Sequence, residues 1–491
     1  MRAGTRRTGA VGVMAEQVTA RSQNGVAVAA APLAARHAAA ALDAGGNAFD
    51  AVLTAVLAEA VLLPPKCGPA GDLIAIVWEA NQAQPEALLA IGGAPGALAD
   101  RVSELRPTGP LSVGVPGAPA GYEALAERSR LGVDRAATIA ERIGREGFTW
   151  STVCTVLAEE AQELLFEHQP NGCVYLPEGR PIAPGSVVQL PGLGRAVAET
   201  ARGGRGWWKG EVADAVLGRV QASGGVLSRE DLLAARAEWV STFSVTVAGT
   251  EVHATPAPTH GLSLLEALAS IEDFGDLADV YGSVRAAISS ARERLADPSG
   301  TSMVSAVDRE GNAALVVHSN SFPQFGSGLI VDGYDLILSN RAGRGFASSL
   351  DHPNGPVAGR RPATTLHAWA FRAPDGTRVL GATPGGANQM PWNAQTLARL
   401  ASGDWDASAT SIGEAVCAPR WQWNPADDSL TVEAGLPVDE MDGLARAARV
   451  ESVERWALRS AMQIVCSLGS GEKMTAWASS DPRTQSLSLP I

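Results

Sequence analysis

The sequence predicts an α/β fold, and three segments carry that prediction. Residues 48–62 repeat apolar side chains at helical spacing, and Asn47 just before them is a typical N-cap residue. Residues 73–78 (LIAIVW) form a continuous apolar run of strand length, which is typical of a strand buried on both faces. Residues 301–338 contain three predicted strands separated by turns, a β-meander. Buried strands between helical segments indicate stacked layers of helix and sheet.

The other predicted elements follow the same alternation along the chain. A strand at 26–30 precedes a helix that ends at the glycine pair 45–46. Further helices are expected at 118–126, 135–145, 150–166, 283–295 and 392–401, and further strands at 378–380, 430–432 and 464–465. The Pro- and Gly-rich turns between 172 and 210 are too short to act as a linker between independent domains.

Composition excludes several classes of protein. The chain has 491 residues, 46% of them hydrophobic and 19% charged, so it can bury a large core and is not intrinsically disordered. Its formal net charge of −13 repels the phosphates of nucleic acids and the surfaces of anionic membranes. We therefore expect neither nucleic acid nor a membrane as a partner.

Cysteine usage and the apolar segments indicate a cytoplasmic location. The five cysteines are scattered, with no C-x-x-C pair and no histidine at zinc spacing, which fits a reducing compartment. The Arg-rich N-terminus reaches Glu16 before any apolar segment of signal-peptide length. The apolar stretch 51–63 contains Glu59 and is shorter than the roughly 20 residues that span a bilayer.

Common catalytic motifs are absent from the sequence. It has no G-x-S-x-G, no Walker loop, no H-E-x-x-H and no dinucleotide-binding G-x-G-x-x-G in the required context. His318 and His367 fall on predicted strands, where a single histidine is more often a packed residue than a ligand. We predict neither a metal site nor a cofactor.

A candidate nucleophile lies at the junction of Gly300 and Thr301. If the chain were cut there, the Thr301 hydroxyl could attack while its own α-amine, with an ordinary pKa of about 7.7–8.0, accepts the proton. Gly385 and Gly386, in the segment TPGG, could supply backbone N–H donors to the developing oxyanion. The alternative is that Thr301 only begins a strand and the glycines only form a turn.

The order of several longer segments resembles the γ-glutamyltranspeptidase family of N-terminal nucleophile hydrolases. The matching segments cover nearly the whole chain: DAGGNAFDA (43–51), PKCGPAGDLIAIVWE (65–79), VPGAPAGYEAL (115–125), GGVLSREDL (224–232), PAPTHG (256–261), GTSMVSAVDREGNA (300–313), FGSG (325–328), HPN (352–354), RRP (360–362), TPGG (383–386) and EAVCAPRW (414–421).

This resemblance implies a fold, a maturation step and a set of roles. The fold would be a four-layer αββα sandwich, and self-cleavage before Thr301 would leave fragments 1–300 and 301–491 together as one heterodimeric unit. Thr301 matches the family's nucleophile. The other implied site residues are Gly385 and Gly386 at the oxyanion, Thr364 and Thr365 at the substrate, and Ser319 and Asn320 near a polar strand residue that holds substrate and nucleophile.

Three departures from the family pattern bear on the substrate and on self-cleavage. Ile91 stands where transpeptidases have the arginine that binds the glutamyl α-carboxylate, and Arg341 and Arg344 stand near the place of the acidic pair that binds the α-ammonium. Because an unpaired charge in a closed site is costly, we expect γ-glutamyl recognition to be lost. The two arginines could bind a substrate carboxylate or could be solvated loop cations. The short spacing before Thr301 leaves a non-maturing homologue open.

The resemblance also suggests a pathway. The Ala-, Gly- and Arg-rich composition resembles that of high-GC actinomycete proteins, whose homologues of this family serve antibiotic pathways to 4-alkyl-proline units. That implies hydrolysis of a carbon–carbon bond in a small carboxylated precursor, with loss of an oxalate-like fragment. The alternatives are a γ-glutamyltransferase or hydrolase, an amidase of the cephalosporin-acylase kind, and a non-enzymatic relative. We further expect Asp72 to cap or form a turn, and Cys67, Trp392 and Trp421 to be packed.

Overall fold

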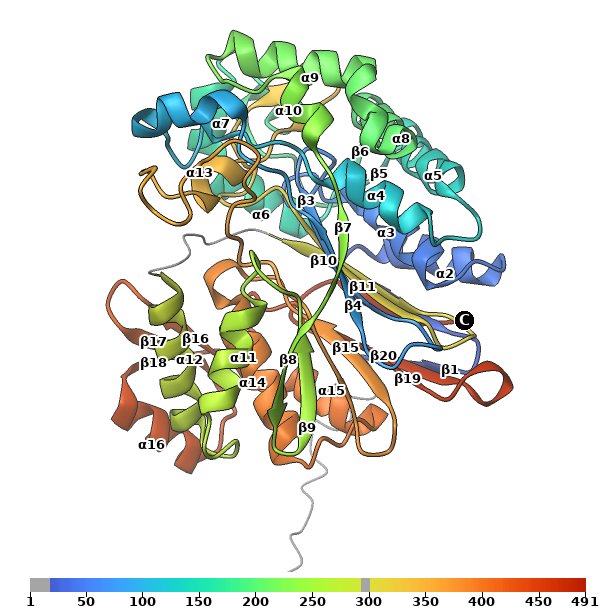
Figure 1. Ribbon diagram of the computed structural model, residues 1–491, viewed down its shortest axis with the longest axis vertical. Coiled ribbons are helices and arrows are strands. Elements are labelled where there is room, and N and C mark those ends of the chain that lie inside the picture. The colour runs from blue at the N-terminus through green and yellow to red at the C-terminus, as the bar shows by residue number, and fades with distance from the viewer. Residues whose placement is uncertain (1–17, 293–300) are drawn as a thin grey trace, which may run out of the picture.

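Two β-sheets face each other and are covered on their outer sides by helices, which makes four layers in the order αββα (Figure 1). The computed structural model describes residues 18–292 and 301–491. The Arg-rich N-terminus and the residues just before Thr301, including Gly300, on which parts of the sequence prediction depend, lie outside these residues. The predicted four-layer architecture is confirmed.

The first sheet has seven strands, and every neighbouring pair in it is antiparallel. Its strands, in spatial order, are β21 (Leu487–Pro490), β2 (Val26–Ala29), β10 (Ser302–Val307), β11 (Ala313–Ser319), β3 (Asp72–Trp78), β4 (Glu86–Ala90) and β7 (Glu238–Ser241). All seven residues of β3 are buried, as its continuous apolar sequence predicts.

The second sheet also has seven antiparallel strands. In spatial order they are β1 (Thr19–Ser22), β20 (Thr475–Ser480), β19 (Gln463–Leu468), β15 (Arg378–Ala382), β14 (Trp369–Arg372), β9 (Thr250–Ala254) and β8 (Phe243–Val247). Apolar side chains from the facing sides of both sheets, such as Met303 and Val317 from the first and Leu380 and Val465 from the second, form one core.

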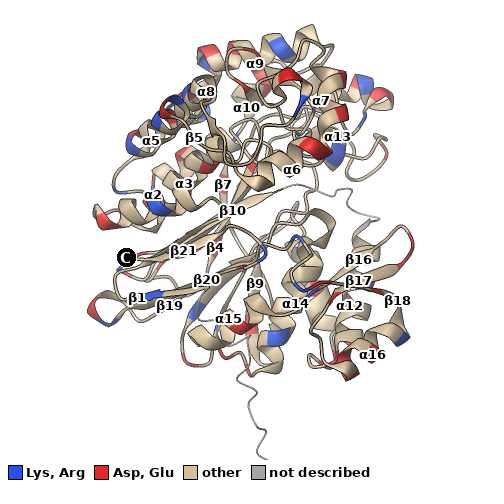
Figure 2. Cartoon of the chain, turned by 180° about the vertical axis from the view of Figure 1, so that it is seen from behind, with Lys and Arg blue, Asp and Glu red and all other residues tan. Residues whose placement is uncertain are grey.

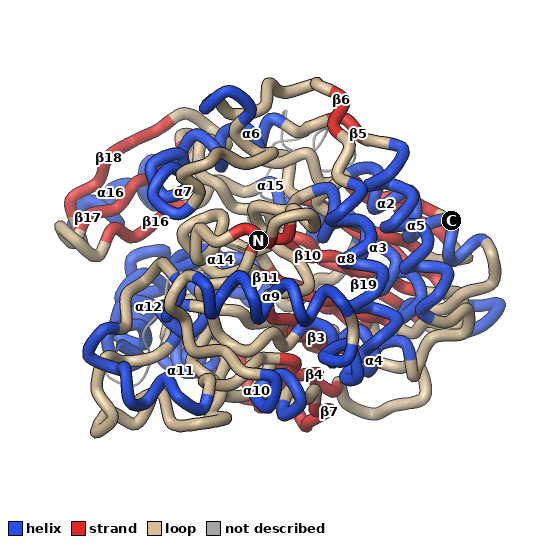
Figure 3. Tube along the Cα trace, turned by 90° about the horizontal axis from the view of Figure 1, so that it is seen from above, coloured by secondary structure: helices blue, strands red, loops and turns tan. Residues whose placement is uncertain are grey.

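Helices from the N-terminal part of the chain cover the first sheet. They are α2 (Pro32–Asp43), α3 (Ala48–Leu62), α4 (Ala118–Ala126), α5 (Val133–Glu146) and α8 (Pro191–Gly203), with α6 (Thr152–Glu160), α7 (Gln162–His168), α9 (Glu211–Ala222) and α10 (Arg229–Ala234) around them. Viewed from above, α3, α5 and α8 lie side by side across the strands (Figure 3).

The second sheet is covered by helices of the C-terminal part and by α11 and α12. These helices are α11 (Gly261–Ser270), α12 (Leu277–Arg292), α14 (Gln389–Ser402) and α15 (Ala409–Cys417), and beside them lie α16 (Val438–Ala447) and a small sheet of β16 (Trp421–Asn424), β17 (Ser429–Glu433) and β18 (Arg449–Val453). Charged residues lie mainly on the helices of both outer layers and on loops, whereas the strands between them are mostly uncharged (Figure 2). Among the described residues, no helix is both long enough and apolar enough to cross a bilayer.

Helix α3 illustrates how local sequence sets an element. The Asp50 amide donates to Asn47 Oδ1 (3.1 Å) and the Asn47 amide donates to Asp50 Oδ2 (2.9 Å), a capping box that begins the helix at Ala48. All fifteen of its side chains are buried between β10, β11 and the neighbouring helices. The predicted bounds and N-cap are confirmed.

The predicted three-stranded meander is wrong in its third strand. Strand β11 pairs with β3 over seven residue pairs, whereas segment 327–338 forms a separate two-stranded hairpin of β12 (Ile330–Val331) and β13 (Leu336–Ile337). The chain leaves the sheet at Ser321, whose φ is 72°. The physical reason is that the long apolar β3 offers β11 a full ladder, which two-residue strands around a glycine turn cannot match.

Two helix predictions also need correction. The helix expected over 150–166 is divided into α6 and α7 at Ala161, whose ψ of 6° interrupts the helical ladder. The helix expected from 283 begins earlier, at Leu277, because Asp276 accepts a hydrogen bond from the Ala278 amide in the first turn. The last residues predicted for that helix lie beyond the described part of the chain.

Candidate active site

Thr301 immediately precedes β10, in the middle of the first sheet. Along this strand Met303 contributes to the core between the two sheets, and Val304 contributes to the core under the helices. Because side chains alternate along a strand, Thr301 faces the second sheet and Ser302 faces the helices. Thr301 is 2% exposed, so its hydroxyl lies inside the sandwich.

Polar residues of two neighbouring strands lie at the same level as Thr301. In the ladders Ser302 pairs with His318, and Ser319 pairs with Asp72. Extending the first ladder by one residue places Ser319 opposite Thr301, about 5 Å away at the backbone. Thr301, Ser319 and Asp72 therefore form a polar row across β10, β11 and β3 that faces the second sheet.

The second sheet side contributes a side chain that contacts the Thr301 hydroxyl. Gln389 Nε2 donates a hydrogen bond to Thr301 Oγ1 at 3.0 Å, and both residues are buried. Gln389 is the first residue of α14 and follows Gly386 by three positions. Sequence reasoning missed Gln389, although its place directly after the TPGG segment was a signal that could have found it.

The two predicted glycines form the tight turn that leads into Gln389. Gly385 has φ of 147° and Gly386 has φ of 61°, both conformations that favour glycine. A Cβ atom at Gly385 would lie 2.2 Å from the ring of Trp392, so this turn packs directly on that ring. The packing brings the glycine turn to the start of α14, where Gln389 contacts the candidate nucleophile.

Thr364 and Thr365 lie just before β14, and a hydrogen-bonded chain holds Thr365. Trp369 Nε1 donates to Asn393 Oδ1 (2.9 Å), Asn393 Nδ2 lies 2.8 Å from His367 Nε2, and His367 Nδ1 lies 2.8 Å from the Thr365 carbonyl oxygen. Because the amide nitrogen only donates and the carbonyl only accepts, His367 carries its proton on Nδ1. Burial lowers the pKa of His367 to about 4, so this imidazole is neutral at ordinary pH.

Asn320 and Thr364 each support the backbone near the site. The Asn320 side chain donates through Nδ2 to the Pro64 carbonyl oxygen (3.2 Å), and the Asn320 backbone N–H donates to the Lys66 carbonyl oxygen (2.9 Å). The Thr364 amide donates to the Pro258 carbonyl oxygen at 3.0 Å. These bonds tie the end of β11 and the segment before β14 to neighbouring loops.

Asp72 and Arg341 form a buried ion pair at the far end of the polar row. Asp72 Oδ2 accepts from Arg341 Nε at 2.7 Å, and Asp72 Oδ1 accepts from the Gly92 amide at 2.9 Å. Burial raises the pKa of the Asp72 carboxyl, and Arg341 opposes that shift. Asp72 thus begins a strand and binds an arginine, rather than capping or forming a turn as predicted.

The other two residues that depart from the family pattern are placed as follows. Arg344 lies on the short helix α13 (Arg341–Gly345) and is half-buried, and Ile91 is buried beside Gly92.

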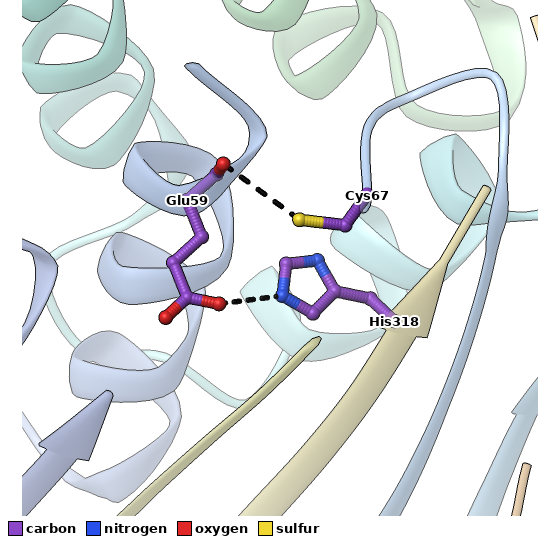
Figure 4. A group of neighbouring side chains, drawn as sticks. All are labelled: Glu59, Cys67 and His318. Carbon is purple, nitrogen blue, oxygen red and sulfur yellow. Dashed lines mark hydrogen bonds and ion pairs between the residues drawn. The ribbon is translucent and has the colours of Figure 1, made fainter. Parts of the chain in front are cut away.

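A second cluster lies behind Thr301, on the helix-facing side of the first sheet. It consists of Glu59, Cys67 and His318 (Figure 4). Each residue offers one ligand atom, and these three atoms lie within 4.8 Å of one another, close enough for one metal ion to contact all three. The Cys67 thiol, however, donates to the carbonyl oxygens of Glu59 and Leu63, and burial raises its pKa well above the ordinary value. Hydrogen bonds already link Cys67 to the Glu59 carbonyl oxygen and His318 to the Glu59 carboxylate, so the cluster is held together without an ion. Cys67, Trp392 and Trp421 are all packed, as predicted.

The arrangement defines a class of protein. Two antiparallel sheets between helical layers are the αββα fold expected for the N-terminal nucleophile hydrolases. The chain belongs to the gamma-glutamyltranspeptidase family, whose model matches residues 34–288 and 281–491. It is therefore a gamma-glutamyltranspeptidase-like hydrolase.

Individual relatives are distant but similar in length. The glutathione hydrolase proenzyme of Escherichia coli strain K12 is 24% identical, with 90% of this chain and 87% of the relative covered. The oxamate amidohydrolase proenzyme of Klebsiella pneumoniae is 26% identical, with 84% of this chain and 88% of the relative covered. The crystal structure of cephalosporin acylase from Bacillus halodurans has a TM-score of 0.81 at 24% identity and covers 100% of this chain and 98% of that one.

Proposed function

We propose that the protein is a threonine hydrolase that cuts its own chain before Thr301 and then uses the freed Thr301 as its nucleophile. The observation that carries the proposal is the hydrogen bond from Gln389 Nε2 to Thr301 Oγ1, next to the glycine turn. Acyl transfer needs a nucleophilic hydroxyl and amide donors for the oxyanion, and Gln389 follows the two glycines that would supply these donors by three positions. Ser319, opposite Thr301 on β11, would hold the hydroxyl and the substrate from the other side.

The topology supports the proposal that both fragments stay together after cleavage. Strands β2 and β3 belong to fragment 1–300, and β10, β11 and β21 belong to fragment 301–491. Within the first sheet β2 lies between β21 and β10, and β11 lies next to β3. Separating the fragments would break these three ladders, so we expect a stable heterodimer.

The proposed reaction proceeds through an acyl-enzyme. The α-amine of Thr301 takes the hydroxyl proton as Oγ1 attacks a substrate carbonyl, and the Gly385 and Gly386 amides donate to the oxyanion. When the intermediate collapses, the bond between the carbonyl carbon and the leaving group breaks, and the leaving atom takes the proton from the α-ammonium. Water then hydrolyses the Thr301 ester, with the amine again accepting a proton, which restores the enzyme.

The substrate we favour is a small carboxylated 4-alkyl-proline precursor that loses an oxalate-like fragment by carbon–carbon cleavage. Arg344 lies on the short helix α13 and is half-buried, and its planar guanidinium suits a substrate carboxylate. Ile91 offers no charge at all, which argues against a γ-glutamyl group. The likeness to an oxamate amidohydrolase supports an oxalyl-type acyl group, because oxamate is the monoamide of oxalic acid.

Amide hydrolysis is the second candidate, and the names of the relatives favour it. Both the cephalosporin acylase and the oxamate amidohydrolase are named for the cleavage of carbon–nitrogen bonds. The proposed machinery would serve either bond, because it acts on the carbonyl and not on the leaving group. The two candidate reactions therefore differ only in which substrate group Arg344, Thr364 and Thr365 hold in place.

The first experiment examines maturation. Wild-type protein should give two bands on a denaturing gel, with an N-terminal Thr-Ser-Met-Val on the smaller fragment. Thr301→Ala should stay one band and lose at least ~10³-fold in product formation. Thr200→Ala, a control at a buried threonine of α8, should mature normally. A single wild-type band, or full activity in Thr301→Ala, would overturn the proposal.

The second experiment identifies the bond. Mature enzyme is incubated with a pyrroline dienoate, a glutaryl amide, oxamate and a γ-glutamyl amide, and products are identified by mass spectrometry. Oxalate released from the dienoate supports carbon–carbon cleavage, whereas turnover of only the amides selects the amidase. Turnover of the γ-glutamyl amide alone would contradict the proposed substrate class.

A further inference from the structure

The carboxylate of Glu59 projects from a helix whose buried side chains are almost all apolar. Glu59 is fully buried in α3, a helix whose other inward-facing residues are almost all Ala, Val and Leu. Burying a carboxylate is unfavourable unless hydrogen-bond donors surround it. An apolar residue would fit the pattern of α3 better, so helix formation alone does not explain this residue.

Three donors converge on this carboxylate from three segments of the first sheet. The Ala31 amide, just after β2, donates to Oε1 at 3.0 Å. The Ser302 hydroxyl donates to Oε2 at 2.7 Å. His318 Nε2 donates to the same oxygen at 3.0 Å (Figure 4). A carboxylate only accepts, so the imidazole carries a proton on Nε2. Glu59 therefore ties together the ends of β2, β10 and β11.

The hydrogen bond between Ser302 and Glu59 lies one residue from the proposed nucleophile, Thr301. Ser302 and Thr301 point to opposite faces of the sheet, so a bond that fixes the Ser302 side chain also limits how the Thr301 backbone can move. The Thr301 amine and hydroxyl are both attached to that backbone. Because a misplacement of about 1 Å can lower a rate by 10²-fold, holding this position matters for the reaction.

We propose that Glu59 is a positioning residue for the nucleophile, acting through Ser302 from the opposite face of the first sheet. The proposal rests on the proposed function of Thr301 and deepens it. Glu59 does not touch the substrate. It holds the strand end on which the reacting hydroxyl and its base are carried, while Gln389 contacts the hydroxyl from the other side.

Asp308 provides a matched control at the other end of the same strand. It is 1% exposed, follows β10 directly, and accepts hydrogen bonds from the Ala48 amide of α3 (3.0 Å) and from the Asn312 side chain (2.8 Å). It is thus a buried carboxylate that ties β10 to α3, like Glu59. Seven residues of extended chain place it about 20 Å from Thr301.

The experiment compares mature Glu59→Gln with mature Asp308→Asn. Glu59→Gln should lower kcat by ~10–100-fold with KM changed less than about threefold, because positioning is lost and the substrate contacts are kept. Asp308→Asn should unfold at lower denaturant concentration but keep kcat within about threefold of wild type. Equal losses of kcat in both variants, or none in Glu59→Gln, would overturn the proposal.

A single-turnover measurement separates this proposal from the proposed function. The rate of Thr301 acylation by a carboxylate-bearing β-lactone is followed by intact-mass spectrometry. No acylation of wild type would mean that the proposed function fails, whereas equal acylation of wild type and Glu59→Gln would mean that only the positioning role fails. Slower acylation of Glu59→Gln supports the role.

The path through Ser302 is tested by a double-mutant cycle. If Glu59 acts through Ser302, the variant Glu59→Gln/Ser302→Ala should be acylated no more slowly than the slower single variant. Losses that multiply would overturn that path. Elemental analysis completes the test, because one equivalent of metal that is lost in both Cys67→Ala and Glu59→Gln would replace the hydrogen-bonded positioning role with a metal site.

Discussion

Two buried charged clusters support the two halves of the candidate site, and they are built differently. Behind Thr301, a single carboxylate, Glu59, is held by an amide, a hydroxyl and an imidazole. Beside α14 and α15, the carboxylates of Glu433 and Asp481 meet the guanidinium groups of Arg483 and Arg420. The first cluster fixes one strand end, whereas the second joins several segments.

The second cluster is a balanced ionic network. Glu433 accepts from Arg483 and from the Arg420 and Leu458 amides, and Asp481 accepts from Arg483 (2.9 Å) and the Ser460 hydroxyl (2.7 Å). Burial and the charge of Arg483 lower the pKa of Arg420 to about 10. Removing one member leaves an uncompensated buried charge, so this cluster should govern stability, and the Glu59 cluster should govern rate.

The largest expected effect breaks the balanced network. Glu433→Gln should lower the free energy of unfolding by about 3–5 kcal/mol, because Arg483 loses a charged partner in a dry site. Urea unfolding followed by circular dichroism measures this loss. Glu414→Gln, at an exposed position of α15, is the control and should stay within about 0.5 kcal/mol of wild type. A stable Glu433→Gln with a large loss of kcat would reverse the comparison.

A substitution at Gly385 tests the role of the glycine turn, which lies near the second cluster. Arg420 donates to the Trp392 carbonyl oxygen (3.4 Å), and Gly385 packs on the Trp392 ring. Gly385→Ala should lower kcat by ~10²–10³-fold, because the added Cβ would displace an amide donor from the oxyanion. Gly376→Ala has a similarly positive φ, 92°, but no atom within 4 Å of its Cβ, and should lose stability only. Equal kcat values in both variants would contradict the assigned role of Gly385.

Two buried histidines sharpen the comparison through pH: His318 lies in β11, whereas His367 lies just before β14 and not, as predicted, on a strand. His318 faces a carboxylate, whereas His367 has only neutral partners and a pKa lowered to about 4. Between pH 6.5 and 4 the unfolded chain binds a proton at His367 that the folded chain does not, so stability is complete above pH 6.5 and falls as pH decreases. The loss should approach about 3 kcal/mol at pH 4.

The variant His367→Gln isolates that contribution. The glutamine side chain cannot take up the proton. The difference in unfolding free energy between wild type and this variant should therefore change by about 3 kcal/mol between pH 6.5 and pH 4. Urea titrations at pH 7, 5.5 and 4.5 measure the difference. A constant difference at all three values would show that His367 keeps an ordinary pKa in the folded protein.

The smallest expected effect concerns Gln389. Gln389→Leu removes the donor to Thr301 Oγ1 and should slow acylation about tenfold, the value of one hydrogen bond of about 1.4 kcal/mol. Gln395→Leu, in the same helix but bonded to the Trp421 carbonyl oxygen, should destabilise the fold without a comparable change in rate. If both variants are acylated at the wild-type rate, the contact does not contribute to the reaction.

Elements with strong local signals could be predicted from the sequence. Helix α3 begins and ends where its cap and apolar spacing indicate, and β3 is buried on both faces as its composition indicates. The error in the meander arose where local signals were similar for several strands. Segment 327–338 has strand-like composition, but β3, more than 200 residues earlier, is the partner that β11 selects. Strand pairing depends on which long ladder is available, and this is not a local property.

The candidate site divides in the same way. Thr301 and the glycine turn could be predicted because each is a short local segment with recognisable chemistry and because the family order supports them. Gln389 and Glu59 could not, since their contacts to 301 and 302 join residues 88 and 243 positions apart. The pairing of Arg341 with Asp72 across 269 positions was equally invisible to sequence reasoning.

By itself, the sequence determined the family, the layered architecture and the residue proposed to react, because these depend on periodicity and on segments that keep their order along the chain. Only the tertiary structure decided which distant side chains lie around that residue: Gln389 at its hydroxyl and Glu59 behind the strand. The physical reason is that a side chain's hydrogen-bond partners are set by how sheets and helices pack. A buried polar group is stable only where that packing brings its partners within reach.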